Sequence, residues 1–393
     1  MSHCLLFNST PWKAQKVHLG SCCQPSRLRK VAIVSWAVTE FTRDSGRSIF
    51  DLACDPCTQI LKSQSMGRSE LDAIILASCT SEQYAATIVS EMLGMKPKVS
   101  QRIDNLCNSG TNAIATAYSL IAAEMCDLAL VTGAEKADST GNRLYWDVTR
   151  GAFMFPVHWA AIFANAHMRK YGTTEEQLAE IAVKNRRAGS RNPNALFKVP
   201  VTIEEVMSSR VISEPLKLLD CSASCDGAAA VLLASESKAR EISDHPVWIR
   251  GIGQSTSSAS FANATSDLTT IDSAKLAGRE AFEIAGVRPS SIDVAEVHDA
   301  FTILELLALE DLGFQKPGER NGDAKVAVNP RGGILASGHP VGATGVAQVA
   351  EIAAQLSGKA GPTQVRDCNL GLVHNLAAAG SSATVMIMGT SDL

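Results

Sequence analysis

Short apolar runs alternate with longer segments of helical spacing along most of the chain. An apolar run bounded by turn residues predicts a buried strand, whereas apolar residues three and four apart predict one face of a helix. The alternation of the two patterns predicts an α/β protein. The strands expected on this basis are 31–34, 71–77, 128–133, 228–234, 292–297, 370–373 and 383–388, and the helices are 48–62, 81–93 and 302–312.

The most apolar helical pattern follows a short extended segment and the sequence NLCNSG at 105–110. Ile114, Ala117 and Ile121 lie at helical spacing, and alanines between them leave little polar face, so this helix is expected to be buried. Cys107 is expected in its first turn, where unpaired backbone N–H groups and the helix dipole favour thiolate over thiol. The alternative is a buried structural cysteine.

A second segment repeats this arrangement. The sequence GGILASGHPVGATG at 332–345 passes from an extended run through a glycine-rich turn into an apolar helix at 346–356. The two segments therefore look like one supersecondary unit used twice, with Cys107 at one turn and His339 at the other. If the halves pack about a pseudo-twofold axis, the thiol and the imidazole meet, and such a pair is an activated nucleophile.

Two further stretches place polar groups beside strands. The strand at 292–297 ends in HDAF at 298–301, just before a helix, and sites in α/β proteins gather at the carboxyl ends of strands. The strand at 370–373 precedes HNLAAAG at 374–380, which we interpret as a loop that begins with His374. A polar stretch, CSASCDG at 221–227, precedes the strand at 228–234.

The texture changes between about 137 and 219, where aromatic and basic residues mix, and this region is expected to be an inserted loop domain. Such a mixture suits a phosphorylated, adenine-containing ligand, and a solvated surface is the alternative. His158 and His167 are nine residues apart, which is no metal-ligand spacing, and are expected to pack. The residues that give the region this texture are Arg143, Trp146, Phe153, Phe155, Pro156, His158, Trp159, Arg169, Lys170, Lys184, Arg186 and Arg187.

Composition excludes several classes of partner. The 393 residues contain 36 basic and 40 acidic side chains, so neither nucleic acid nor a membrane surface is expected to bind. Eleven cysteines in scattered positions suit a reducing compartment, and we expect a cytoplasmic protein. The CxxC at 54–57 has no second pair at ligand spacing, which favours structural cysteines over a redox pair or half a zinc site. Residues 1–30 are basic and are expected to be a disordered leader, the alternative being a transit segment.

From about residue 30 to its end the chain resembles the thiolases. The resemblance rests on the motifs at 105–110, 221–227, 298–301, 338–345 and 374–380, in the order and spacing of that family. The HDAF and HN variants are most similar to the archaeal acetoacetyl-CoA thiolases and the sterol-carrier-protein-like group. The resemblance implies a five-layer α-β-α-β-α fold of two similar halves. Residues 31–136 with 224–246 would form the first half, 137–223 the loop domain that binds coenzyme A (CoA) and substrate, and 247–393 the second half.

The same resemblance implies roles for single residues. Cys107 would attack the acyl carbonyl of an acyl-CoA, and His339 would take its proton. His298 and His339 would stabilise the enolate oxygen of the second acetyl-CoA. Backbone N–H groups of Cys107 and Ala377 would hold the thioester oxyanion. Contacts with CoA are expected from Ser222, Ser257 and the aromatic side chains of the loop domain.

The chain departs from most thiolases because it lacks their second cysteine. Ala300 occupies one place where relatives carry it, and His374 or Asn375 the other. His374 is the candidate substitute acid or base, since imidazole titrates near neutral pH; alternatively it only hydrogen-bonds a neighbouring loop. Alanines at 377–379 replace glycines, which would narrow the acyl pocket and favour short substrates.

Retention of Cys107, His298 and His339 favours a working acetyl-CoA C-acetyltransferase that uses CoA esters and needs no metal or redox cofactor. A catalytically weak scaffold or lipid-carrier subunit is the alternative, and a ketoacyl synthase is a third interpretation. The resemblance further implies a homodimer or homotetramer. It also implies a complex with hydroxymethylglutaryl-CoA synthase and a small bridging protein with an OB domain, which would supply isoprenoid synthesis.

Overall fold

The computed structural model describes residues 29–137, 155–263, 265–319 and 325–392. Nearly all of the expected leader lies outside these ranges, as do Arg143, Trp146 and Phe153 of the expected loop domain. Among the described residues, no helix is both long enough and apolar enough to cross a membrane.

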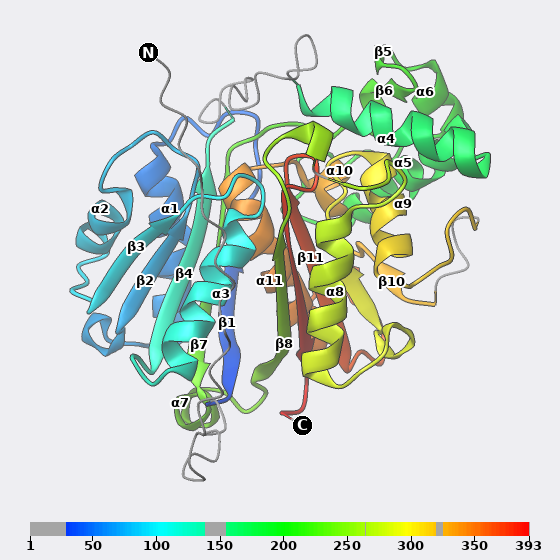
Figure 1. The fold of residues 1–393 in the computed structure, drawn as a ribbon. Helices are drawn as coiled ribbons and strands as arrows, with labels where there is room; N and C mark the ends of the chain where they lie inside the picture. The colour runs from blue at the N-terminus through cyan, green and yellow to red at the C-terminus, as the bar shows by residue number, and fades with distance from the viewer. Residues whose placement is uncertain (1–28, 138–154, 264, 320–324, 393) are drawn as a thin grey trace, which may run out of the picture.

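Ten strands form one sheet in the order β10-β9-β11-β12-β8-β1-β7-β4-β2-β3 (Figure 1). In the first half of the chain, β2 pairs in parallel with β3 and β4, while β7 is antiparallel to β4 and β1. The second half repeats this pattern, since β9 is parallel to β10 and β11, and β12 is antiparallel to β11 and β8. The duplication expected from the two glycine-rich turns is therefore confirmed in the strand order. The strands are β1 (Val31–Val38), β2 (Ala73–Ala77), β3 (Val99–Ile103), β4 (Leu128–Glu135), β7 (Gly227–Ser235), β8 (Val247–Thr256), β9 (Val294–Glu296), β10 (Ala327–Val328), β11 (Leu370–Ala377) and β12 (Ser382–Gly389).

Alternation along the strands divides the core into layers. In β2, Ile75 packs with helices α3 (Ser109–Ala122) and α11 (Val341–Leu356), whereas Ile74 and Leu76 face outer helices. In β12 likewise, Met386 packs with α3 and α11, and Val385 faces the opposite side. The two buried helices thus lie between the half-sheets, which is the α/β layering expected from the sequence. The outer helices are α1 (Ile49–Ser63), α2 (Ala85–Met92) and α7 (Glu236–Ile242) on the first half, and α8 (Asp272–Ala285) and α9 (Thr302–Asp311) on the second.

Helices of the inserted region gather on one side of the molecule, above α9 and the short helix α10 (Gly333–Ser337) (Figure 1). Thr174 and Gln177 form a capping box at the start of helix α5 (Glu175–Gly189). The box satisfies backbone N–H groups that the first turn of a helix leaves unpaired. The apolar face of α5 packs against the second half of the chain. The elements of this region are α4 (Pro156–Tyr171), α5 (Glu175–Gly189), α6 (Ile203–Ser208) and the two-stranded sheet of β5 (Val211–Ser213) and β6 (Leu216–Lys217).

Two placements taken from the sequence are wrong. His374 does not begin a loop, because β11 continues to Ala377 and pairs residue by residue with β12. A polar residue such as the neighbouring Asn375 is typical of a loop, but here the Asn375 amide is buried and donates to the Gln348 side chain at 2.6 Å. Cys107 does not lie in the first turn of α3, which begins two residues later, because Leu106 has a positive φ of 49° that interrupts the helical path.

Candidate active site

Cys107 lies in a tight turn between β3 and α3. The Ser109 hydroxyl donates to the Leu106 carbonyl at 2.6 Å and accepts from the Asn105 N–H at 2.7 Å. The Asn105 amide reaches across to Ser382 in the other half of the chain, at 3.0 Å. Cys107 itself is half-buried. The turn therefore fixes the thiol at the boundary between the halves.

His339 follows the short helix α10. Gly338 has a φ of 91°, and a Cβ there would lie 2.6 Å from the Cys225 sulfur, so only glycine fits this turn. The His339 backbone N–H donates to the Ala223 carbonyl at 2.8 Å. The stretch at 221–227, singled out in the sequence, thus holds the loop that carries this histidine.

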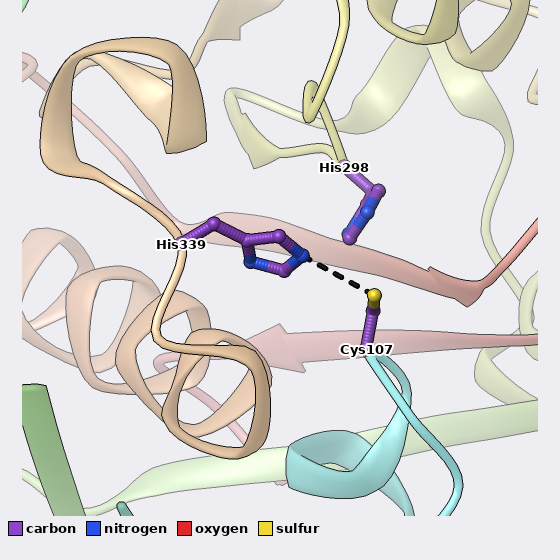
Figure 2. Close-up of side chains that lie close together, drawn as sticks. All are labelled: Cys107, His298 and His339. Atoms are coloured by element: carbon purple, nitrogen blue, oxygen red, sulfur yellow. Dashed lines mark hydrogen bonds between the residues drawn. The ribbon is translucent and has the colours of Figure 1, made fainter. Parts of the chain in front are cut away.

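The thiol of Cys107 and the imidazole of His339 are in hydrogen-bond contact, with 3.2 Å between Sγ and Nε2 (Figure 2). The other ring nitrogen, Nδ1, lies 2.7 Å from the Thr344 hydroxyl. That hydroxyl donates its one proton to the Pro340 carbonyl at 3.0 Å, so it accepts from Nδ1–H. Neutral His339 therefore carries its proton on Nδ1 and offers Nε2 as an acceptor for the thiol proton. The meeting of thiol and imidazole expected from the sequence is confirmed.

His298 completes a group of three side chains from three separate loops (Figure 2). It follows β9, and its ring lies edge-on to that of His339, with 5.4 Å between the ring centres. The Cys107 sulfur and one nitrogen from each histidine all lie within 4.8 Å of one another. Nδ1 of His298 is buried without a hydrogen-bond partner. The group offers two imidazoles to any carbonyl that approaches the thiol.

Burial dominates the protonation of this group. It raises the pKa of the Cys107 thiol to about 11, and the Ala378 backbone N–H opposes that rise only in part. The helix effect expected from the sequence is thus outweighed, because the thiol lies outside the first turn of α3 and among groups with little water around them. Burial also lowers the pKa of His339 to about 4. The resting site therefore holds a neutral thiol and neutral imidazoles.

This neutral pair predicts how Cys107 reacts with an alkylating reagent at different pH values. Its alkylation by iodoacetamide should be slow near about pH 6 and rise steadily to about pH 9, because the reactive thiolate is scarce below its raised pKa. Mass spectrometry of the peptide that contains Cys107 measures the rate. A rate that is already maximal near about pH 5 would instead reveal a preformed thiolate–imidazolium pair.

His374 contacts His298 rather than the thiol. Its Nδ1 accepts from the His298 backbone N–H at 3.5 Å, and its Nε2 is buried without a partner. Burial lowers the pKa of His374 to about 4. The structure thus brings together Cys107, His298 and His339. His374, which lies in β11, contacts the backbone of His298 and does not join this group.

A backbone N–H at the end of β11 reaches the resting thiol beside Ala377, whose expected role as an oxyanion donor stays a prediction. Ala377 is the last residue of β11 and pairs with Ser382, whereas the N–H that hydrogen-bonds to the Cys107 sulfur belongs to Ala378. Ala378 has a φ of 51°, so the chain turns sharply at this point. A strand that ends in such a turn can direct an N–H towards the thiol, which a run of alanines in the sequence does not reveal.

The two serines expected to contact CoA lie beside the site loops. The Ser222 N–H donates to the Ala300 carbonyl at 2.9 Å, and the Ser257 N–H to the Ser381 carbonyl at 2.8 Å. Of the two histidines expected to pack, His167 is buried between Thr173 and Glu310, and His158 lies edge-on to Phe155. Cys57 is buried in α1, which agrees with a structural role.

Sequence reasoning missed Thr344 and Glu135. The Glu135 carboxylate accepts from the backbone N–H groups of Cys79 and Gly342, at 2.8 and 3.2 Å, and so ties the first half of the chain to the start of α11. Thr344 lay inside the motif at 338–345, five residues after His339, where the first turn of a helix brings it back to the ring. That spacing was a usable signal, whereas nothing in the sequence marks Glu135.

Comparison with known families covers both halves of the chain. Residues 31–237 match the description "Thiolase, N-terminal domain" and residues 253–390 match "Thiolase C-terminal domain-like". The chain belongs to the thiolase family. As a thiolase with a paired cysteine and histidine, it is an acyltransferase, and the resemblance noted in the sequence is confirmed.

The names of this thiolase's relatives indicate different activities. An acetyl-CoA acetyltransferase from Methanothermobacter thermautotrophicus is 35% identical over 383 residues, which cover 92% of this chain and 99% of that protein. Sterol carrier protein 2 from Oryctolagus cuniculus is 32% identical over 91% of this chain and 72% of its own length. Among solved structures, the Ltp2-ChsH2(DUF35) aldolase has a TM-score of 0.79 and 27% identity, covering 92% of this chain and 97% of that chain.

Proposed function

We propose that this thiolase is an acetyl-CoA C-acetyltransferase, which condenses two acetyl-CoA molecules to acetoacetyl-CoA or cleaves that product with CoA. The observation that carries the proposal is the contact between Cys107 and His339, whose tautomer is fixed by Thr344. The name of the 35% identical archaeal relative supports the choice of acetyl and acetoacetyl substrates.

The first half-reaction forms an acyl-cysteine. In the cleavage direction the Cys107 proton moves to Nε2 of His339 while sulfur bonds to the 3-keto carbon of acetoacetyl-CoA. The negative oxygen that results is stabilised by backbone N–H groups, for which Cys107 and Ala378 are the proposed donors. Each donor of this kind typically lowers the barrier by about 3 kcal/mol.

The second step breaks the bond between carbons 2 and 3. The bonding electrons leave on the acetyl-CoA fragment as an enolate, whose oxygen lies against His298 and His339. The proton that His339 took from the thiol is then available for the enolate carbon, so a second cysteine at position 300 is not needed. The CoA thiol then attacks the acetyl-cysteine and gives its proton to Nε2 of His339, which returns it to the departing Cys107 sulfur; the second acetyl-CoA is released and the Cys107 thiol is restored.

The same chemistry argues for catalysis without a metal or redox cofactor. The three converging side chains are of types that bind zinc, yet the thiol must keep its electron pair for the acyl carbon. An ion bound to that sulfur would block the attack. We therefore propose that CoA esters are the only small molecules that the reaction requires, and that Ser222 and Ser257 lie along their path.

The setting of the reaction is also part of the proposal. All eight cysteines that the structure describes are free, which suits the reducing cytoplasm. A homodimer or homotetramer, and a complex with hydroxymethylglutaryl-CoA synthase and an OB-domain bridging protein, are proposed from the archaeal resemblance. A coupled synthase would consume acetoacetyl-CoA and draw the condensation forward towards isoprenoid precursors.

Thiolysis of acetoacetyl-CoA tests the function. The purified protein is mixed with acetoacetyl-CoA and free CoA, and loss of the enolate absorbance is followed beside longer 3-ketoacyl-CoAs. Turnover that is fastest for acetoacetyl-CoA supports the proposal, and a preference for long chains would overturn the short-substrate assignment. No turnover on any substrate, with candidate partners added, would favour the scaffold or lipid-carrier alternative.

Replacement of His374 distinguishes its role from that of His298. Because His374 contacts the His298 backbone and not the thiol, His374→Asn is expected to lower kcat by about tenfold or less, whereas His298→Asn should lower it by about 10²-fold. Asparagine at 374 can still accept the same backbone N–H. An equal loss in both variants would make His374 the acid or base that replaces the second cysteine.

A further inference from the structure

A buried polar cluster lies between the inserted region and the two loops that carry the histidines. Its members are Asn185 of α5, Asp299 beside His298, and Glu305 of α9, and all three are almost fully inaccessible to solvent. The Asn185 amide nitrogen donates to Asp299 Oδ2 and to Glu305 Oε2, each at 2.7 Å. We call these three residues the Asn185 cluster.

Asp299 connects both catalytic histidines. It directly follows His298 in the chain. Its carboxylate also accepts the backbone N–H groups of Ile334 at 2.6 Å and Leu335 at 3.3 Å, in the first turn of α10. That helix leads through Gly338 into His339. A displacement of the Asp299 carboxylate would therefore move both imidazoles relative to the thiol.

The orientation of Asn185 is determined by its partners. Both N–H bonds of the amide nitrogen point at carboxylate oxygens, so neither is spare. The amide oxygen is buried without a hydrogen-bond partner. Reversing the amide would place that oxygen against two carboxyl groups and take one hydrogen-bond donor away from each of them, which is strongly unfavourable in a buried site.

Helix α5 is held against α10 by close backbone contact as well. A Cβ on Gly332 would lie 2.6 Å from Gly189, the last residue of α5, so no side chain fits between them. Beyond α5, the Leu196 and Phe197 N–H groups donate to the Ser337 and Ala336 carbonyls, at 3.1 and 3.0 Å. Movements of the inserted region are therefore passed directly to the segment before His339.

The two carboxyl groups of the cluster differ in their other partners. Glu305 forms an ion pair with Lys184 at 2.5 Å and accepts from the Asn329 amide at 2.7 Å. Asp299 has no such ion pair among the described residues. Burial, with the neighbouring charge of Glu305, raises the pKa of Asp299 above its ordinary value. Among the described residues, Asn185 is thus the one side chain that donates a hydrogen bond to Asp299, and it adds no charge.

We propose that Asn185 is a positioning residue for both catalytic histidines: through Asp299 it fixes where His298 and His339 stand relative to the Cys107 thiol. Asn185 touches neither the thiol nor the imidazoles and acts only through this carboxylate. The inserted region would then determine the geometry of proton transfer as well as the binding of CoA.

Alkylation of Cys107 tests this inference without requiring turnover. Iodoacetamide is added to the intact protein near about pH 8, and the alkylation rates of Cys107 and of the half-buried Cys368 are compared in the same sample by mass spectrometry. Asn185→Ala should lower the ratio of the two rates on the order of tenfold, because the displaced His339 no longer accepts the thiol proton. Lys184→Met is the matched control, since the neighbouring lysine binds Glu305 but not Asp299.

The inference is overturned if Asn185→Ala leaves the ratio unchanged or raises it, or if Lys184→Met lowers it equally. A thermal melt shows whether Asn185→Ala is folded. If it is not, Asn185→Ser takes its place: serine retains one hydrogen-bond donor, so the alkylation ratio should fall by less. Thiolysis adds a second readout that rests on the proposed function: kcat should fall while KM for acetoacetyl-CoA is kept. A wild type without thiolysis would refute the proposed function alone, because the alkylation ratio still decides the role of Asn185.

Discussion

Replacing Cys107 by alanine is expected to abolish thiolysis of acetoacetyl-CoA, with kcat lowered by at least about 10⁴-fold. The thiol is the atom that becomes acylated, and no other side chain in the described site takes its place. Loss of the enolate absorbance in the presence of CoA measures the rate, and mass spectrometry shows whether an acetyl group is trapped on the chain.

Two further variants make this result specific. Cys368→Ala removes a half-buried free cysteine whose thiol donates only to the nearby Val365 and Arg366 carbonyls among the described residues, and it should keep wild-type activity. Cys107→Ser keeps the shape of the turn but offers a much weaker nucleophile, so it should be nearly as inactive as the alanine variant. If Cys107→Ala still turned over acetoacetyl-CoA within about tenfold of the wild-type rate, a covalent mechanism through this thiol would be excluded.

Replacing His339 by asparagine should lower kcat by about 10³-fold. The loss is large because one imidazole serves both half-reactions: Nε2 takes the thiol proton in the first and faces the enolate oxygen in the second. The KM for acetoacetyl-CoA should change little, since His339 is proposed to act on the reacting atoms and not on the CoA moiety. Steady-state kinetics of thiolysis separate the two parameters.

Thr344→Val provides a graded comparison for His339→Asn. Valine keeps the volume near the ring but removes the oxygen that accepts from Nδ1–H, so the proton can move to Nε2 and the thiol loses its acceptor. An intermediate loss in kcat is therefore expected. His245→Asn, at an exposed histidine, should behave as wild type. Full activity in His339→Asn would assign the thiol proton to His298 instead.

Much of the fold was readable from apolar patterns because this sheet is buried on both faces. Strands such as β7 and β12 are continuous apolar runs, and their expected bounds agree with the structure to within a residue. By contrast, β3 has exposed and half-buried side chains at the edge of the sheet, so it carried no strand signal stronger than an extended segment. The helix at 48–62 carries a periodic apolar face, whereas the helix found at 302–312 is buried nearly all round.

The site was predictable where chemistry depends on residue type and not where it depends on local geometry. Cys107, His298 and His339 stood out as reactive side chains at turns. The hidden parts were of another kind: a positive φ at Leu106, an N–H supplied by Ala378, and a buried environment that raises the thiol pKa. Residue types alone do not reveal these three features, because each depends on how distant segments enclose the turn.

The positions of buried polar residues were mispredicted for the same reason. His374 and Asn375 looked like loop residues, yet they are buried within a strand, where the Asn375 amide nitrogen donates to Gln348 of α11. The role of Asn185 was equally hidden, since an asparagine among the basic residues of an amphipathic helix gives no sign that it faces two carboxyl groups 114 and 120 residues away.

Gly110 and Gly345 bring the two buried helices into backbone contact one turn from the reacting groups. A Cβ on Gly110 would lie 2.6 Å from the Val346 nitrogen, and one on Gly345 would lie 2.7 Å from the Thr111 nitrogen. Since the nucleophile belongs to one repeat and its base to the other, neither repeat is an enzyme by itself. Turnover therefore reports on the docking of the repeats: any change that parts these two helices separates the thiol from its base and will extinguish activity.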